Sequence, residues 1–480
     1  MKMKLQEMVL KVDVPFVTDM AQNYRPPSWP PPPEWPVVID KAGRVVSRWG
    51  EPIWDVTPWC GSPERLVFGD AEASPGSVAT NNAELLRQAI GWLIWGPRGY
   101  RKVGTIKNKF GALWTVVALC NRNGIRASTL QRFPKVLEQL PACIASSRWE
   151  PTISVLHRLY DAREALGFTL LDESGMKRLV GAASEYESVQ TPYIPPRIWV
   201  YQVTRLRECL EDFMAHRTHI ESCFNYCIDA YVKNFKTLEA ALGLKNTSRG
   251  PFTRGNDHER ARHYVGPFVE TAQRFGIEAL MRRWVVGWGE TRVSMLSSYL
   301  SLVTFAGQAY IANFTLQRRE EVNSLRADCL TWENDERLGR IPLVRGETTK
   351  TKTDSDARWV ASPSIEIAVE ALVSIARLRM ACDARNPVMQ VSPSDVDNPY
   401  LSSTGTEPWG FATRKAKPYD VRTKLSSIKD TLTRYPKLFD EAALRITSDD
   451  LKVARRLTPN LPAKEFAEGL VWPLAWHQYR

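Results

Sequence analysis

Cysteine is scarce in this chain. Eight cysteines lie among 480 residues, and no two of them form a Cys-x-x-Cys pair. A secreted disulfide framework is therefore not expected, and the cytoplasm, a reducing compartment, is the default assignment. The N-terminus also lacks the apolar stretch of a signal peptide. One uncharged run, residues 293–317, is long enough to span a membrane, but its nine polar side chains favour a buried helix, so no membrane partner is expected.

Common catalytic and metal motifs are also missing. There is no GxxxxGK[ST] phosphate loop and no HExxH zinc motif, and the six histidines form no readable Ser/His/Asp set. One metal candidate lies on a single predicted helix and consists of His216, His219, Cys223 and Cys227. The last three share a helix face, but a tetrahedral zinc site usually draws ligands from two elements. A buried core stripe is the favoured interpretation, and no metal or cofactor is expected.

The charge balance is basic and uneven. Lys and Arg number 64 against 53 Asp and Glu, which gives a net charge of +11 and suggests a polyanionic partner. Residues 1–78 do not carry this excess, because they hold 8 basic and 10 acidic residues. Residues 85–137 hold ten basic residues and no acidic one, as phosphate binding requires, although a solvated helical face is the alternative. We expect DNA contacts from Arg98, Arg101, Lys102, Lys107, Lys109, Arg122 and Arg126.

The chain divides into three parts by composition. Residues 1–78 are expected to form an irregular, Pro/Trp-rich arm, in which the prolines of 24–36 exclude helix and favour polyproline II. This arm either docks a partner or lies on the body of the protein with Trp29 and Trp35 packed against it, and the second interpretation is favoured. Residues 79–190 have helical periodicity and constitute a basic domain.

Residues 191–196 form a Pro-rich linker to a third part, 191–480. A long amphipathic helix is predicted over 197–240 and a strand-and-hairpin region over 338–363. Further helices are expected near 266–285, 293–316, 364–383 and 419–434. The expected fold class is mostly α with a small β-hairpin or sheet region, that is, α+β.

Three motifs in this third part follow a recognisable order. In the first, Arg318 opens a helix, Glu321 follows three residues later, and Val322 and Leu325 form an apolar pair at helical spacing. This pattern resembles the first arginine box of the tyrosine recombinase (phage integrase) family. Arg319 is an alternative register, but it would place Val322 at the acid position.

The other two motifs are a lysine hairpin and a terminal box. Lys352, followed by Thr353 and later by Arg358-Trp-Val360, resembles the family's Lys-Thr…Arg-x-Val hairpin, with Lys350 as a lesser candidate. His477 and Arg480 fit the family's His-x-x-Arg box, whose three-residue step places both side chains on one helix face.

The resemblance implies a chemistry as well as a fold. It implies a helical DNA-gripping domain and a mixed α/β catalytic domain that close around duplex DNA. Arg318 and Arg480 would bind the non-bridging oxygens of a phosphorane, and Glu321 would orient this clamp. Lys352 would protonate the leaving 5′-oxygen and His477 would act as a hydrogen-bond donor or acid/base. The implied 3′-phosphotyrosine intermediate would conserve the energy of the DNA phosphodiester bond, so no metal or nucleotide would be needed.

The chain departs from the family pattern at its end. The family places its nucleophilic tyrosine after His-x-x-Arg, whereas this sequence stops at Arg480 and has Tyr479 inside the box. We therefore expect a catalytic domain that is C-terminally incomplete, and whether the chain is an enzyme stays open. The long spacing between Lys352 and His477 further indicates an insertion within 391–465, and a second is expected near 210–290.

The expected function is that of a site-specific DNA recombinase or integrase of a mobile element. Its partner would be double-stranded DNA in the nucleoid, bound as a homo- or hetero-oligomer. One alternative is a non-catalytic DNA-binding protein that keeps the recombinase fold. Another is a helical scaffold whose basic face meets RNA or a protein.

Overall fold

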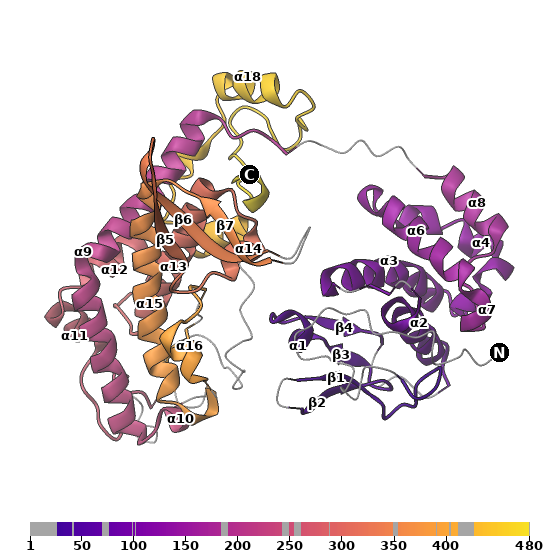
Figure 1. Ribbon diagram of the computed structural model, residues 1–480, viewed down its shortest axis with the longest axis horizontal. Helices are drawn as coiled ribbons and strands as arrows, with labels where there is room; N and C mark the ends of the chain where they lie inside the picture. The colour runs from indigo at the N-terminus through magenta and orange to yellow at the C-terminus, as the bar shows by residue number, and fades with distance from the viewer. Residues whose placement is uncertain are drawn as a thin grey trace. The chain divides into compact units, whose positions relative to one another are not determined.

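The chain folds into two compact units, residues 1–188 and 189–480. The computed structural model, shown in Figure 1, describes residues 26–40, 43–69, 76–97, 99–100, 102–183, 191–241, 249–253, 261–287, 289–348, 354–389, 391–402, 405–410 and 427–479. These residues are mostly helical and carry small antiparallel sheets, so the predicted α+β class is confirmed.

Unit 1 begins with short strands and continues as helices. Strand β1 pairs with β2 and β3 pairs with β4, both antiparallel. The elements are β1 (Pro36–Ile39), β2 (Val45–Arg48), β3 (Ile53–Asp55), α1 (Thr57–Cys60), β4 (Arg65–Val67), α2 (Val78–Trp95), α3 (Val103–Arg122), η2 (Ala127–Arg132), α4 (Pro134–Leu137), α5 (Leu140–Cys143), η3 (Ser146–Arg148), α6 (Trp149–Asp161), α7 (Arg163–Leu166) and α8 (Glu173–Gly181). The prediction of an irregular 1–78 is therefore wrong for the strand residues.

Tryptophans of the N-terminal segment pack on helix α2. Trp35 is buried and lies edge-on to Trp95 with ring centroids 5.2 Å apart, and Trp29 contacts Trp49 at 5.8 Å. A Cβ added at Gly91 would lie 2.7 Å from the Trp49 ring, so this helix position requires glycine. The expected packing of Trp29 and Trp35 on the body of the protein is confirmed. It shares one hydrophobic core with the helices that follow.

Unit 2 is built on three long helices. Helix α13 packs against both α9 and α15. The elements are α9 (Pro196–Phe235), α10 (Leu238–Ala241), α11 (Phe268–Arg274), α12 (Glu278–Trp284), α13 (Ser294–Thr315), α14 (Arg319–Asn323), β5 (Leu330–Asp335), β6 (Gly339–Thr348), β7 (Asp354–Val360), η5 (Pro363–Ile365), α15 (Glu366–Ala384), η6 (Pro387–Met389), α16 (Pro393–Asp397), α17 (Ile428–Arg434), η7 (Ala442–Leu444), α18 (Ser448–Leu457) and η8 (Trp476–Tyr479).

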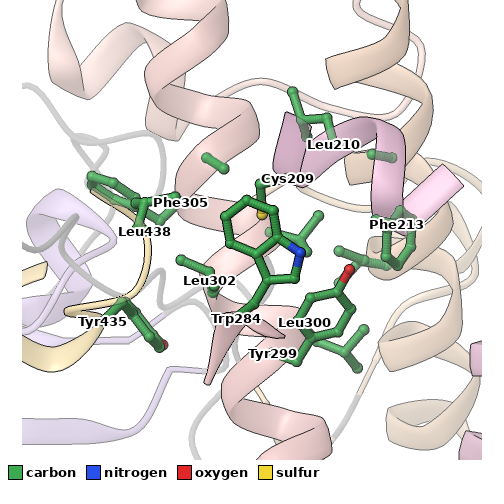
Figure 2. Packing of buried hydrophobic residues seen from close by; sticks show 14 of the residues in the cluster. Cys209, Leu210, Phe213, Trp284, Tyr299, Leu300, Leu302, Phe305, Tyr435 and Leu438 are labelled. Carbon is green, nitrogen blue, oxygen red and sulfur yellow. The ribbon is translucent and has the colours of Figure 1, made fainter. Parts of the chain in front are cut away.

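Helix α13 is the centre of unit 2. Of its 22 residues, 18 are buried, so the uncharged run is a helix enclosed on nearly all sides. A Cβ on Gly307 would lie 2.8 Å from the Leu372 side chain, which shows how closely α13 and α15 approach. Figure 2 shows Trp284 of α12 and Tyr299 of α13 packed with Phe213 of α9. Within the described residues, no helix is both long and apolar enough to cross a bilayer.

Strands β5, β6 and β7 form one antiparallel sheet in that order. Leu330 pairs with Val344 across β5 and β6, and Arg345 pairs with Arg358 across β6 and β7. This is the hairpin region predicted from the sequence. The 266–285 helix prediction is only partly right, because Gly276 at φ 67° separates α11 from α12.

The cysteines of α9 lie in the core. Cys209, Cys223 and Cys227 are buried, and burial raises the pKa of the Cys227 thiol. His216 places Nδ1 2.8 Å from the backbone oxygen of Asp212, and His219 is exposed. Among the described residues, no group of three or more His, Cys, Asp or Glu side chains could hold a metal ion. The structure thus agrees with a core stripe for Cys223 and Cys227 but not for the exposed His219. Cys329 and Cys382, the other cysteines of unit 2, are also buried.

A candidate phosphate-binding site after helix α13

The chain turns sharply where α13 ends. Leu316 occupies the helix C-cap with φ 54°, a left-handed conformation that is unusual for a residue with a side chain, and it is 60% exposed. Gln317, in contrast, is 1% exposed, and its Oε1 accepts a hydrogen bond from the Thr315 hydroxyl at 3.2 Å. This turn brings Arg318 to the N-cap of the short helix α14.

Glu321 fixes Arg318 in place. The backbone N–H of Arg318 donates to Glu321 Oε2 at 2.7 Å, and its guanidinium Nη1 donates to Oε1 at 2.7 Å. The Glu321 side chain is 7% exposed and the Arg318 side chain 30% exposed. Arg319 instead pairs with its neighbour Glu320 on the surface. The acid three residues downstream therefore contacts Arg318, the register favoured from the sequence.

A third donor to Glu321 comes from the sheet. The Thr348 hydroxyl at the end of β6 donates to Glu321 Oε1 at 2.8 Å, so α14 lies beside this strand (Figure 1). Burial alone would raise the pKa of Glu321, but the hydrogen bonds from Arg318 and Thr348 outweigh burial and hold this pKa below its usual value. The group is therefore a carboxylate at neutral pH, and it keeps the guanidinium oriented.

The predicted lysine belongs to the connection after this strand. Thr348 is four residues before Lys352, and β7 resumes at Asp354. Lys352 and the lesser candidate Lys350 lie outside the described residues. The structure thus brings the arginine box and the last residue of the hairpin strand into contact. It does not describe the lysines themselves.

Residues Trp476–Tyr479, which include His477 of the terminal box, form a 3-10 turn, η8, rather than the expected start of an α-helix. His477 is exposed on this turn, whereas Tyr479 is 5% exposed and donates its hydroxyl to Gln202 Oε1 at 2.9 Å. Burial raises the pKa of the Tyr479 hydroxyl. Arg480 lies outside the described residues. Tyr479 is thus fixed in the core and is not free to attack a phosphate.

The terminal turn and the last turns of α13 both contact the first turns of α9. Gln202, which holds Tyr479, is three residues from Trp199 on α9, and the Trp199 indole donates to Asn313 Oδ1 at 2.9 Å. Three residues correspond to about one helical turn, so the terminal box and the last turns of α13 meet the same part of α9. Within the described part of the chain, no hydrogen bond or ion pair joins His477 to Arg318.

The basic stretch of unit 1 is less free of counter-charges than its sequence suggests. Lys107 pairs with Glu64 at 2.5 Å, and Arg87 is buried against Glu84. Both acids lie outside residues 85–137, so a search of that stretch could not find them. The expectation of an uncompensated stretch is wrong at these two positions.

The other predicted DNA-contacting residues differ in their surroundings. Lys109 donates to the Pro151 carbonyl at 3.3 Å and lies over the Tyr100 ring, which leaves it half-buried. Lys102 and Arg126 are exposed, and the exposed Arg122 donates to Cys143 Sγ at 3.3 Å. Arg98 and Arg101 lie outside the described residues.

Two residues of the site were not predicted from the sequence. Thr348 is 27 residues from Glu321, and Gln202 is 277 residues from Tyr479. Neither residue belongs to a motif, and no local spacing indicates such distant contacts.

Comparison of the chain with family models, with curated proteins and with solved structures finds no match.

Proposed function

We propose that the chain is a DNA-binding protein of tyrosine recombinase type in which Arg318 binds the scissile phosphate. The observation that carries this proposal is the contact among Arg318, Glu321 and Thr348, which joins the arginine box to the hairpin strand that leads to Lys352. A fixed guanidinium is suited to a phosphate because its N–H groups match two oxygens in one plane.

The arrangement around Arg318 supports a role toward a ligand. Glu321 engages one end of the guanidinium, while the side chain keeps 30% of its surface exposed. The Nε–H of Arg318 is buried and has no acceptor among the described residues. Buried donors are usually satisfied, so an oxygen supplied by a ligand would complete the site. Charge that develops on a phosphorane would be stabilised by such a pre-oriented cation.

Unit 1 would supply the grip on duplex DNA. At the end of α3 and in the turns after it, four cations are exposed and form no ion pair within the described residues. These are Arg122, Arg126, Arg132 and Lys135. Unpaired surface cations are those that can exchange condensed counterions for phosphate.

Covalent trapping tests the proposal. The substrates would be nicked duplexes with the sequence of the DNA that flanks the gene, designed so that cleavage releases a short strand and traps the covalent adduct. Each substrate would be incubated with this chain and, separately, with a form continued by any residues encoded after Arg480. We expect a denaturation-resistant adduct that depends on Arg318. Arg318→Ala should slow its formation by about 10²–10³ while DNA binding persists, because a charged transition-state donor is removed. Arg318→Lys should rescue poorly, since an ammonium cannot form a bidentate fork.

Arg319→Ala is the matched control, because this neighbouring arginine pairs only with Glu320 in the described structure. It should leave adduct formation unchanged. Adduct that forms equally well in Arg318→Ala would contradict the assigned role. DNA binding without adduct from either form would favour the second candidate, a non-catalytic DNA-binding protein. The buried Tyr479 favours that candidate, because this tyrosine is held away from solvent.

A further inference from the structure

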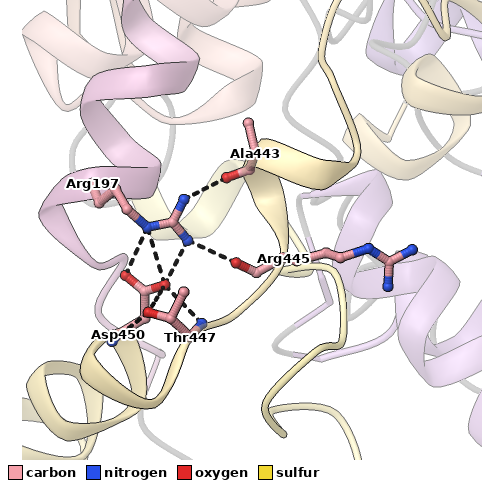
Figure 3. A network of polar contacts seen from close by, with 5 residues as sticks. All are labelled: Arg197, Ala443, Arg445, Thr447 and Asp450. Carbon is pink, nitrogen blue, oxygen red and sulfur yellow. Dashed lines mark hydrogen bonds and ion pairs between the residues drawn. The ribbon is translucent and has the colours of Figure 1, made fainter.

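The C-terminal segment of unit 2 is bound by the first turns of helix α9. Figure 3 shows the guanidinium of Arg197 donating to the carbonyls of Ala443 and Arg445, each at 2.7 Å. The same group forms an ion pair with Asp450 at 2.5 Å. Asp450 also caps α18 by accepting from Thr447, so one arginine joins α9 to two parts of this segment.

The next turns of α9 continue the contact. The Tyr201 hydroxyl accepts from the backbone N–H of Asp440 at 2.6 Å, and Arg205 donates to the Leu438 carbonyl at 3.0 Å. Arg197, Tyr201 and Arg205 are four residues apart, so they lie along one face of the helix. This face therefore holds residues 438–450 in a defined position.

Gln202 lies beside this face and holds the terminal turn. A 3-10 helix has three residues per turn, so Trp476 and Tyr479 point to the same side. Trp476 packs edge-on to Phe305 at 5.7 Å, and Tyr479 donates to Gln202 at 2.9 Å. His477 lies between these two anchors and is exposed.

Packing alone does not explain a glutamine at position 202. The residue is 0% exposed, and its Nε2 has no acceptor within the described residues. An apolar side chain of similar length would avoid this unsatisfied donor. The one hydrogen bond that the Gln202 side chain forms in the described structure is the bond accepted from Tyr479.

We infer that Gln202 is a positioning residue for His477, acting through the hydroxyl of Tyr479. In this arrangement Tyr479 is an anchor: its ring fills the core and its hydroxyl fixes the rotation of the turn. The imidazole of His477 is then presented to solvent from a turn held on both sides. The role of His477 toward DNA rests on the proposed function, whereas the dependence of the turn on Gln202 does not.

The test compares three variants by hydrogen exchange and by NMR of the His477 imidazole. Gln202→Met keeps length and removes the acceptor, Tyr479→Phe removes the donor, and the double variant removes both. Each single change should speed amide exchange across 472–479 by about tenfold, the effect expected from removing one hydrogen bond, and should shift the His477 signals. The double variant should show no faster exchange and no larger shift of the His477 signals than either single variant, because the two side chains form one hydrogen bond.

Tyr201→Phe is the matched control. It deletes a hydroxyl one residue away on the same helix, from a bond to Asp440 rather than to the terminal turn. Exchange over 472–479 and the His477 signals should stay unchanged. Unchanged exchange and unchanged His477 signals in both Gln202→Met and Tyr479→Phe would overturn the inference, as would the same disturbance in Tyr201→Phe.

Strand cleavage separates this inference from the proposed function. In a form that cleaves DNA, Gln202→Met should lower the rate and alter its pH profile without weakening DNA affinity, and Gln202→Glu, which keeps an acceptor, should restore part of the rate. If His477 is disturbed but no form cleaves DNA, the positioning role stands and the recombinase function fails. A cleavage rate that stays unchanged in variants whose His477 signals shift would contradict a catalytic role for this turn.

Discussion

Glu321 shows how a single carboxylate can organise a site. Its two oxygens accept from the backbone and guanidinium of Arg318 and from the hydroxyl of Thr348, and its side chain is only 7% exposed. Hydrogen bonds to the charged form lower a pKa, and here they outweigh the opposing effect of burial. The charge on Glu321 is therefore linked to folding as well as to the orientation of Arg318.

Glu321→Gln should change how stability depends on pH. Because the pKa of Glu321 is lowered in the folded state, its charge stabilises the fold above the usual carboxyl pKa of 4.5, and this contribution disappears as pH falls through the lowered pKa. At pH 7 the variant should lose about 1–2 kcal/mol, a modest figure because Arg318 is partly exposed. Urea unfolding between pH 7 and pH 3 measures the free energy of unfolding of both proteins. Plotted against pH, the values for the unchanged chain and for Glu321→Gln should converge at low pH. A constant gap at every pH would show that the carboxylate charge is not involved.

The contacts of this site differ in how far the sequence could predict them. Arg318 and Glu321 are three residues apart at a helix start, so local geometry alone predicts their pairing. Thr348 reaches Glu321 only because a strand folds back beside α14, and Glu64 reaches Lys107 from the loop before β4. Such contacts depend on the tertiary arrangement, which residue spacing does not contain.

Helices α13 and α15 enclose an ion pair. Arg379 of α15 is 1% exposed and lies 3.3 Å from Glu407, whose side chain is fully buried. Glu407 also accepts from the Ser297 hydroxyl of α13 at 3.0 Å. Removal of one member of a buried pair leaves an uncompensated charge, whereas removal of both does not.

Arg379→Met should therefore destabilise unit 2 by about 3–5 kcal/mol, and adding Glu407→Met should recover much of that stability. Arg385→Met is the control, because its pair with Asp229 is exposed and should be worth no more than about 1 kcal/mol. Urea unfolding of the variants measures each value. Equal destabilisation by Arg379→Met and Arg385→Met would contradict the view that burial makes the inner pair costly to break.

Long helices were the elements that the sequence predicted best. The expected helix over 293–316 is α13, and that over 364–383 is α15, because apolar residues recur along more than four turns of each. Strands β1 to β4 were missed. They are only three or four residues long and lie among prolines, so no alternating pattern could develop.

The residues that we expect to contact DNA are distributed over both units. The candidate phosphate site lies in unit 2, while the exposed cations that follow α3 lie in unit 1. Triple reversal of Arg126, Arg132 and Lys135 to Glu should weaken DNA binding for all sequences alike. The log–log dependence of affinity on salt should flatten by roughly 0.9 for each DNA phosphate that the variant no longer neutralises.

The control for this charge reversal is the same change to Glu at three exposed side chains on α7 and α8 of unit 1, namely Arg163, Lys177 and Arg178. It changes the net charge by the same amount outside the basic stretch. Titration of duplex DNA at several salt concentrations measures both sets. An equal flattening of the slope in the control would mean that overall charge, rather than this surface, governs binding.

The distribution of cysteines gives the two units different chemical reactivity. Cys60 and Cys143, both in unit 1, are half-buried, whereas the five cysteines of unit 2 are buried. Burial raises the pKa of Cys329 to about 12, so its nucleophilic thiolate is scarce as well as shielded. A brief pulse of an alkylating reagent would thus mark unit 1 in folded molecules but mark unit 2 only after it opens. Cys120, which is buried in unit 1, would be marked only after that unit opens. The masses of the peptides labelled at Cys120 and at the cysteines of unit 2 would then show, without any engineered probe, which half of the chain unfolds first.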